Sequence, residues 1–282
     1  MDQSKRTTYI IAAIAFVAIL VGIYFLFIFQ KGSEGPRGTE GVGEVKALNE
    51  LTLKDRPYVT LTPTSDGAEI IVSIENMAAF EKIEYELTYL SDNPQVPGEK
   101  IQRGATGTDI NTRDQKYKKS VLLGTASRGV RSPDKGITDG KLLLHLFRGD
   151  TQYDSETNWD LVQVGSRRST ITDRGGKFKL QVLGFTNDYW VIITETVGVP
   201  KPQDFDIQKV VLPSYGVFSI APKFAKKGDL SITLEDGTGD YTLYIYNHGD
   251  STWGKPDSSY NKSTKTLTSQ VEFFSTFIAV AK

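Results

Sequence analysis

The pattern of apolar and polar residues begins with one long apolar run and continues as short alternating segments. The run Tyr9–Phe29 holds 21 residues without a charged side chain. As a helix it would span about 30 Å, the thickness of the hydrocarbon core of a bilayer. Aromatic residues lie at both of its ends, as they do at membrane interfaces. The run therefore predicts a transmembrane helix. The alternative is a cleaved signal peptide, whose apolar region would be shorter and followed by a small-x-small cleavage site.

The charges that flank this run bear on its orientation. Lys5 and Arg6 precede it and Lys31 and Arg37 follow it, so the positive charges are nearly balanced. The short tail of residues 1–8 favours the cytoplasmic side for the N-terminus. We therefore expect an uncleaved signal anchor in the cell membrane, with a single pass and the C-terminal ectodomain outside the cytoplasm.

Residues 30–56 are expected to form a flexible linker that is rich in glycine. Gly32, Gly35, Gly38 and Gly41 recur at every third position. A collagen-like run of this length, with little proline, is too short to hold a triple helix. Because Gly-rich chains behave as coils, a tether between membrane and ectodomain is the favoured interpretation.

After the linker, apolar and polar residues alternate in short segments separated by turn residues. In Lys82–Leu90 the apolar positions recur at every second residue, which is typical of a half-buried strand. Lys141–Arg148 is apolar at both parities and should be a central strand. The other strands expected in the first half are Tyr58–Thr62, Ala68–Ile74, Tyr117–Gly124 and Trp159–Val164.

A second series of strands follows the segment Gly165–Ser169, which we interpret as a domain boundary. These strands are Lys177–Leu183, Asp188–Thr196, Phe205–Leu212, Val217–Ala221, Leu230–Glu235, Tyr241–Asn247, Lys265–Phe273 and Thr276–Ala281. Many short strands without a helical run indicate antiparallel sandwiches. The expected fold class is all-β, with two immunoglobulin-like β-sandwich domains at residues 57–165 and 169–282 behind the N-terminal transmembrane helix.

A resemblance accompanies this organisation. The anchor, the Gly-rich tether and segments such as TLTPTSDGAEIIVSIENM, GKLLLHLF and YWVIITETVG resemble uncharacterised membrane-anchored proteins of candidate-phylum bacteria with small genomes. The resemblance implies a bacterial surface protein with tandem immunoglobulin-like sandwiches. It implies no activity and no functional residues.

The composition removes several kinds of chemistry. The chain has no Cys, so disulfides and thiolate nucleophiles are excluded, and its two His residues are too few for a three-histidine metal site. A net charge of −1 gives no general attraction to nucleic acid, and no nucleic-acid partner is expected. No established nucleophile, metalloprotease or phosphate-loop motif occurs in its proper context. No catalytic residue is assigned, and we expect a protein that is not an enzyme.

Four oxygen-bearing side chains provide a candidate calcium site. Asp154, Glu156, Asn158 and Asp160 alternate in an expected loop, with a spacing like the start of an EF-hand. Calcium takes six to eight oxygen ligands, which sandwich loops can supply. However, Trp159 stands where that loop needs glycine. No cofactor is expected, and calcium at these residues is the alternative to a solvated acidic turn.

Three aromatic residues are candidates for ligand binding. Tyr244 and Tyr246 share one face of an expected strand, and Trp253 lies in a polar stretch. Exposed aromatic residues in a row mark binding surfaces, and they can stack on sugars. The alternative is ordinary packing between neighbouring strands.

These observations lead to one expected function and two alternatives. Sandwich domains present loops and edges without needing a cofactor. We expect a membrane-anchored, non-catalytic protein for adhesion, recognition or envelope scaffolding, with an unidentified protein or glycan ligand. The alternatives are a carbohydrate-binding module for wall or capsule glycans, and an enzyme with an unrecognised carboxylate site.

Overall fold

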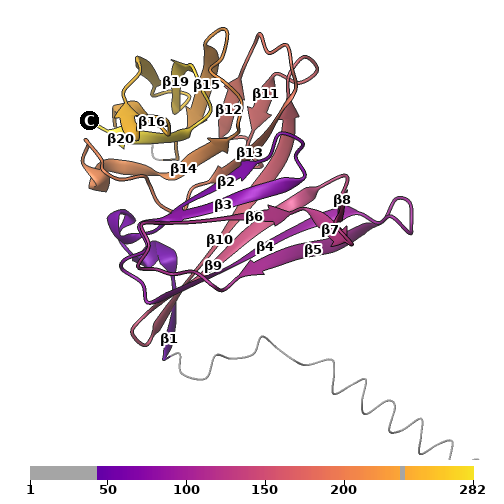
Figure 1. The fold of residues 1–282 in the computed structure, drawn as a ribbon. Helices are drawn as coiled ribbons and strands as arrows, with labels where there is room; N and C mark the ends of the chain where they lie inside the picture. Colours follow the sequence, from indigo (N-terminus) through magenta and orange to yellow (C-terminus); the bar gives the residue numbers. More distant parts are fainter. Residues whose placement is uncertain (1–42, 236–238) are drawn as a thin grey trace, which may run out of the picture. The chain divides into compact units, whose positions relative to one another are not determined.

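The structure, a computed structural model, describes residues 43–235 and 239–282. The expected cytoplasmic tail, the transmembrane helix Tyr9–Phe29 and residues 30–42 of the linker lie outside the described residues. Within the described ranges, no helix is long and apolar enough to cross a membrane. Strands dominate these ranges, and the helical elements are the short 3-10 helices η2 (Leu48–Glu50), η3 (Leu53–Asp55) and η4 (Ile207–Lys209). The prediction of an all-β fold with antiparallel sheets is confirmed (Figure 1).

One long sheet runs through both halves of the described chain. Its ten strands are β1 (Glu44–Ala47), β4 (Lys82–Asp92), β5 (Lys100–Gly107), β9 (Thr138–Arg148), β10 (Thr151–Val164), β13 (Tyr189–Glu195), β14 (Val210–Phe218), β16 (Tyr241–Asn247), β17 (Thr252–Gly254) and β20 (Thr276–Ala281). The strand order is β17-β16-β20-β14-β13-β10-β9-β4-β5. β1 pairs with β10 in parallel, beside the main path.

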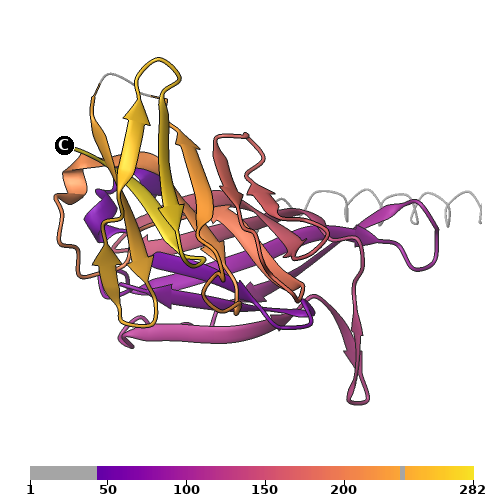
Figure 2. The same cartoon turned by 90° about the horizontal axis from the view of Figure 1, so that it is seen from above.

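Three smaller sheets accompany this ten-stranded sheet. The three-stranded sheet contains β2 (Tyr58–Pro63), β3 (Glu69–Glu75) and β6 (Lys116–Leu122). The five-stranded sheet contains β11 (Thr170–Thr172), β12 (Phe178–Gln181), β15 (Gly228–Thr233), β18 (Ser258–Asn261) and β19 (Thr266–Val271). β7 (Gly124–Ser127) and β8 (Val130–Pro133) form a two-stranded hairpin that projects from the first half, as does the tip of the β4–β5 hairpin (Figure 2).

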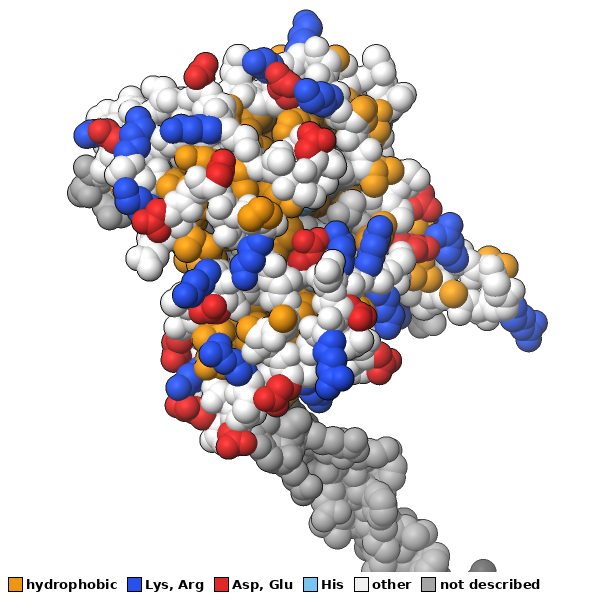
Figure 3. All heavy atoms as spheres, turned by 60° about the vertical axis from the view of Figure 1, so that its left-hand side comes forward, with side chains coloured by type: hydrophobic (Ala, Val, Ile, Leu, Met, Phe, Trp, Pro, Cys, Tyr) orange, Lys and Arg blue, Asp and Glu red, His pale blue; other side chains and the backbone are white. Residues whose placement is uncertain are grey.

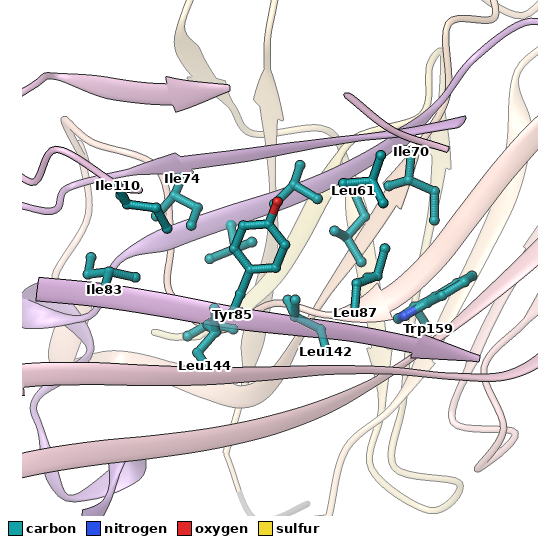
Figure 4. Close-up of a cluster of buried hydrophobic side chains, with 14 of the residues drawn as sticks. Leu61, Ile70, Ile74, Ile83, Tyr85, Leu87, Ile110, Leu142, Leu144 and Trp159 are labelled. Carbon is teal, nitrogen blue, oxygen red and sulfur yellow. The ribbon is translucent and has the colours of Figure 1, made fainter. Parts of the chain in front are cut away.

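The ten-stranded sheet contributes to two cores from its opposite faces. In β10, Trp159 lies in the first core whereas Val164 lies in the second. In β13, Ile192 lies in the first core whereas the adjacent Ile193 lies in the second. Because successive side chains of a strand point to opposite faces, the two cores lie on opposite sides of β10 and β13. The first core fills the space between the three-stranded sheet and strands β4, β9 and β10 (Figure 4).

The two halves therefore share strands rather than only a linker. β10, from the first half of the chain, pairs with β13, from the second half, from Trp159–Thr194 to Val164–Tyr189. Gly43–Lys282 forms one compact unit. A buried hydrogen bond of 2.6 Å also joins the hydroxyls of Tyr58 and Thr276 across the halves. The expected domain boundary at Gly165–Ser169 therefore lies between two hydrophobic cores. The ten-stranded sheet continues across it through the pairing of β10 with β13.

Several local expectations differ from the structure. Residues 43–56, expected within the flexible linker, form β1, η2 and η3, and Leu48 is buried. The prediction of a loop at Asp154–Asp160 is wrong, because this segment belongs to the fourteen-residue strand β10. One strand, β14, stands where two strands were expected at Phe205–Leu212 and Val217–Ala221. The short edge strands β11, β17 and β18 were not foreseen, because they are too short to show an alternating pattern.

Candidate functional site: an open groove at the edges of two sheets

A groove of about 1180 Å³ opens in the second half of the chain. Strands β16 and β17 of the ten-stranded sheet line part of it, and strands β12, β15, β18 and β19 of the five-stranded sheet line the rest. This volume exceeds the roughly 300–1,000 Å³ typical of pockets for small molecules. The groove can therefore accommodate a segment of a polymer.

The lining of the groove combines hydroxyl, amide and charged side chains with an apolar part. The charges balance, with three basic and three acidic residues: Lys179, Lys227, Lys255, Asp229, Asp257 and Glu272. The uncharged polar side chains include those of Gln181, Ser231, Asn247, Thr252, Ser258, Ser259, Thr268, Ser269 and Gln270. Leu230, Ile245 and Val271, which are otherwise buried, supply the apolar part together with Pro256 and Phe273. Such a lining suits a ligand without net charge that forms many hydrogen bonds.

Two of the three acidic residues of the groove, Glu272 and Asp229, have side-chain partners. Glu272 accepts a hydrogen bond from Lys223 at 2.7 Å, and Lys227 lies 3.5 Å from it. The hydrogen bond and charge of Lys223, with the charge of Lys227, hold the pKa of Glu272 below its ordinary value. Asp229 accepts a hydrogen bond from Gln270 at 3.2 Å. These carboxylates are arranged as surface ion pairs and hydrogen bonds. A general acid at neutral pH needs the opposite arrangement, which raises its pKa.

Basic and acidic side chains are also mixed elsewhere on the surface. Figure 3 shows blue and red side chains interspersed around hydrophobic atoms on the face that it draws. This face presents no patch of a single sign among the described residues, so it gives no electrostatic attraction to a polyanion.

The three aromatic candidates lie on the side of β16 and β17 away from the groove. Thr252 and Gly254 line the groove, so the intervening Trp253 points to the other face of the strand. There the Trp253 ring lies 5.2 Å from that of Tyr246 and 5.1 Å from that of Phe205. Tyr244 lies 4.8 Å from the same Phe205 ring, and Tyr246 is buried. The structure brings the three residues together in one cluster with Phe205, in which Tyr246 is buried and Tyr244 and Trp253 are half-buried.

The four calcium candidates lie on one face of β10. Alternate residues of a strand are about 6.6 Å apart along its axis, which separates them too widely to surround one ion. Three of them already have partners: Asp154 lies 2.9 Å from His145, Glu156 lies 2.7 Å from Lys141, and Asp160 lies 2.8 Å from Arg174. Asn158 accepts a hydrogen bond from the same arginine. No group of three or more His, Asp or Glu side chains that could hold a metal ion occurs in the described part of the chain.

Both histidines take part in packing. His145 lies on the exposed face of β9 beside Asp154 and within 3.4 Å of Gln152. The ring of His248 packs against Tyr58 and Tyr246, although the residue as a whole is exposed in its turn. Burial of the ring lowers the pKa of His248, and this effect outweighs the charge of Glu75, which raises it. His248 thus contributes to the contact between the two halves.

The groove itself was not anticipated from the sequence. Its side chains come from six segments between Lys179 and Phe273, and each segment is unremarkable by itself. The sequence feature that could have indicated the groove is the high content of Ser, Thr and Asn between Ser251 and Gln270. The alternating pattern of a strand does not by itself require so many of these residues.

No protein-family model matches the chain, and no curated protein matches it.

Proposed function

We propose that this is a membrane-anchored recognition protein that binds its ligand in the groove without chemical conversion. The observation that carries the proposal is the groove itself, which is open, large and lined by balanced charges and hydrogen-bonding side chains. Such a surface can hold a ligand in a defined orientation without a reactive group. Adhesion, recognition and envelope scaffolding all need this property.

The location of the protein in the cell is part of the proposal. The apolar run Tyr9–Phe29 supports a signal anchor with the C-terminal part outside the cytoplasm. Residues 30–42 would then connect the bilayer to β1, the first strand of the described fold. Two sheet-on-sheet cores on opposite faces of one sheet support a relation to immunoglobulin-like sandwiches.

The absence of native cysteine makes the topology simple to test. A single cysteine introduced as Ser259→Cys lies on an exposed position of β18, and Ser4→Cys lies on the expected cytoplasmic side. We expect a membrane-impermeant maleimide to label only Ser259→Cys in intact cells, and to label both variants after lysis. Labelling of only Ser4→Cys in intact cells would show the reverse orientation.

Ligand binding is tested with the full-length protein in lipid nanodiscs. Purified wall, capsule, lipid and protein fractions of the envelope are applied to the wild type and to Ser259→Trp, which places a large ring in the groove. Thr106→Trp, on the exposed edge strand β5, is the matched control. We expect at least one fraction to be retained by the wild type and the control but not by Ser259→Trp. Equal retention by all three proteins would contradict a binding role for the groove.

The carbohydrate-binding alternative keeps the same groove but changes the ligand. Hydroxyl and amide side chains could also serve a glycan. The residues that would stack on its rings, Trp253 and Tyr244, are packed on the other face. Glycan binding therefore remains an outcome of the experiments and is not the favoured proposal. The enzyme alternative requires turnover of a bound fraction, which the same samples can reveal.

A further inference from the structure

The ten-stranded sheet ends at β5, at the opposite end of the strand order from the groove strands β16 and β17 (Figure 1). β5 has eight residues and, among the described strands, it pairs only with β4. We propose that β5 is a second binding site, at which an extended, acidic polypeptide segment of a partner protein adds as a further strand. This site is separate from the groove, and it does not depend on the proposed function.

The other edges of the described sheets are short or protected. β1, β7, β8, β11, β17 and β18 have only three or four residues each. β2 includes Pro63, which lacks an N–H group, and β6 carries Lys116, Lys118 and Lys119, which discourage pairing. Residues 104–107 of β5 are small and uncharged. β5 therefore offers the longest edge on which an extended segment can pair through its main chain.

The main chain of β5 is open on the side away from β4. Its N–H and C=O groups on that side have no hydrogen-bond partner in the ranges that the structure describes. The two charged side chains of the strand are engaged elsewhere. Lys100 donates hydrogen bonds to the carboxylate of Asp92 at 2.8 Å and to the main-chain carbonyl of Gly136. Arg103 lies 3.6 Å from the carboxylate of Asp134, so neither charge protects the edge.

Two basic side chains lie on the inner faces of the two sheets that enclose the first core. Arg103 is the cross-strand neighbour of Tyr89, which belongs to this core, so it points to the inner face of the ten-stranded sheet. Lys119 is the neighbour of Val72, another core residue, in the three-stranded sheet. Lys119 is nevertheless exposed, because β6 is an edge strand. Each sheet thus directs one basic side chain towards the space between them.

Two contacts show that β6 lies over β4 and β5. The hydroxyl of Tyr117, in β6, lies 3.5 Å from that of Tyr85, the cross-strand partner of the last residue of β5. Nearer the start of β5, Asp134 lies beside the arginine of that strand and donates its main-chain N–H to the carbonyl of Leu123, just beyond β6. Lys119 lies between these contacts along β6. It therefore lies opposite the middle of β5.

The class of the partner follows from these charges. Lys119 has no ion pair within the described ranges, and the buried Nε of Arg103 has no hydrogen-bond partner there. An extended segment paired with β5 would direct every second side chain into the same space. A carboxylate at such a position would meet both basic groups. A second copy of this chain would instead add a further arginine and lysine to them, so the charges favour an acidic partner.

Peptide selection tests this class of ligand. Full-length protein in nanodiscs is used to select from a phage library of random twelve-residue peptides. We expect enrichment of peptides that lack proline and carry Asp or Glu at alternate positions, because one face of an added strand meets the basic groups. Failure to enrich any peptide, or enrichment without an excess of acidic residues, would overturn the proposal.

Lys119→Glu and Lys118→Glu form a matched pair of variants. Both residues are exposed on β6, but adjacent side chains of a strand point to opposite faces. The selected peptides should bind about tenfold more weakly to Lys119→Glu and equally to the wild type and Lys118→Glu. Equal binding to all three proteins, or an equal loss with both variants, would contradict a contact with Lys119. Loss of binding with Ser259→Trp would assign the peptides to the groove and overturn the site at β5.

Hydrogen exchange on the wild-type protein provides a measurement that does not depend on any variant. A selected peptide that adds as a strand should slow exchange about tenfold at alternate amides of residues 101–107 and leave β18 unchanged. Peptides that bind without this protection would overturn strand addition. Protection of β5 that arises without peptide when several copies share a nanodisc would identify a second copy as the occupant, and would overturn the acidic partner.

Discussion

The two adjacent residues Ile192 and Ile193 should act on different cores, and this can be tested directly. Both belong to β13, and their exposures are 0% and 2%. Ile192 packs in the first core together with residues that precede it by up to 144 positions, such as Leu48. Ile193 packs in the second core with Leu230 and Ile232. We therefore predict that Ile192→Ala and Ile193→Ala have similar energetic costs but different structural effects.

The magnitude follows from burial. Truncation of a fully buried isoleucine to alanine costs about 2–5 kcal/mol, through lost transfer free energy and the cavity that remains. For a unit of 150–250 residues, each kcal/mol lowers the melting temperature by about 2–4 °C. Each variant should therefore melt roughly 10 °C below the wild type. Because β10 and β13 contribute to both cores, we expect a single transition in each case.

Methyl NMR of the full-length protein in micelles assigns the core that each variant disturbs. Ile192→Ala should shift the methyl signals of Leu142 and Leu144, and Ile193→Ala should shift those of Leu230 and Ile232. The thermal melts, followed by circular dichroism, give the energetic cost. If Ile192→Ala shifted the signals of the second core and left those of Leu142 and Leu144 unchanged, the shared-sheet arrangement would be refuted.

Three further predictions concern other contacts. Gly107→Ala would place a Cβ atom against the ring of Tyr85, so urea unfolding should show a loss of about 1–3 kcal/mol. Adding Tyr85→Leu should cost less than the sum of the two changes, and full additivity would contradict the clash. Arg174→Ala removes the hydrogen bonds to Asp160 and should lower the free energy of unfolding by about 1–2 kcal/mol in thermal melts. Arg174→Lys should recover only part of this stability, because lysine cannot form the paired contact of the planar guanidinium. Full recovery with lysine would contradict the importance of that paired contact. The folded-state pKa of His248 lies below its ordinary 6.5, so the unfolded chain takes up the proton first, and stability should fall as pH decreases below about 6.5. His248→Gln should reduce this dependence, and an unchanged pH profile would show that other groups cause it.

The sequence was sufficient for the class of structure and for many individual strands. A period of two in Lys82–Leu90 follows from the geometry of a strand with one buried face, and the structure places β4 there. Lys141–Arg148, apolar at both parities, is part of β9, which has paired strands on both sides. These features are local, so the order of residues alone encodes them.

The candidate calcium residues show where local patterns cease to be sufficient. Asp154, Glu156 and Asp160 look like the side chains of an exposed turn, because acidic residues are common there. They lie on one face of a long strand instead, where Lys141 and Arg174 form ion pairs with Glu156 and Asp160 and His145 lies beside Asp154. Two of these partners come from the neighbouring strand β9, and Arg174 follows β11. The pairing therefore depends on tertiary contacts that residue type does not reveal.

The sequence by itself determined the all-β class and the absence of cysteine chemistry, and it predicts a membrane span at Tyr9–Phe29. Only the tertiary structure decided that β10 pairs with β13, that one sheet contributes to two cores and that strands of two different sheets line one groove. The physical reason is that side-chain alternation specifies which face of a strand is buried but not which strand lies beside it. Pairing between distant segments depends on how all the apolar faces are covered at once, and this is a property of the whole fold.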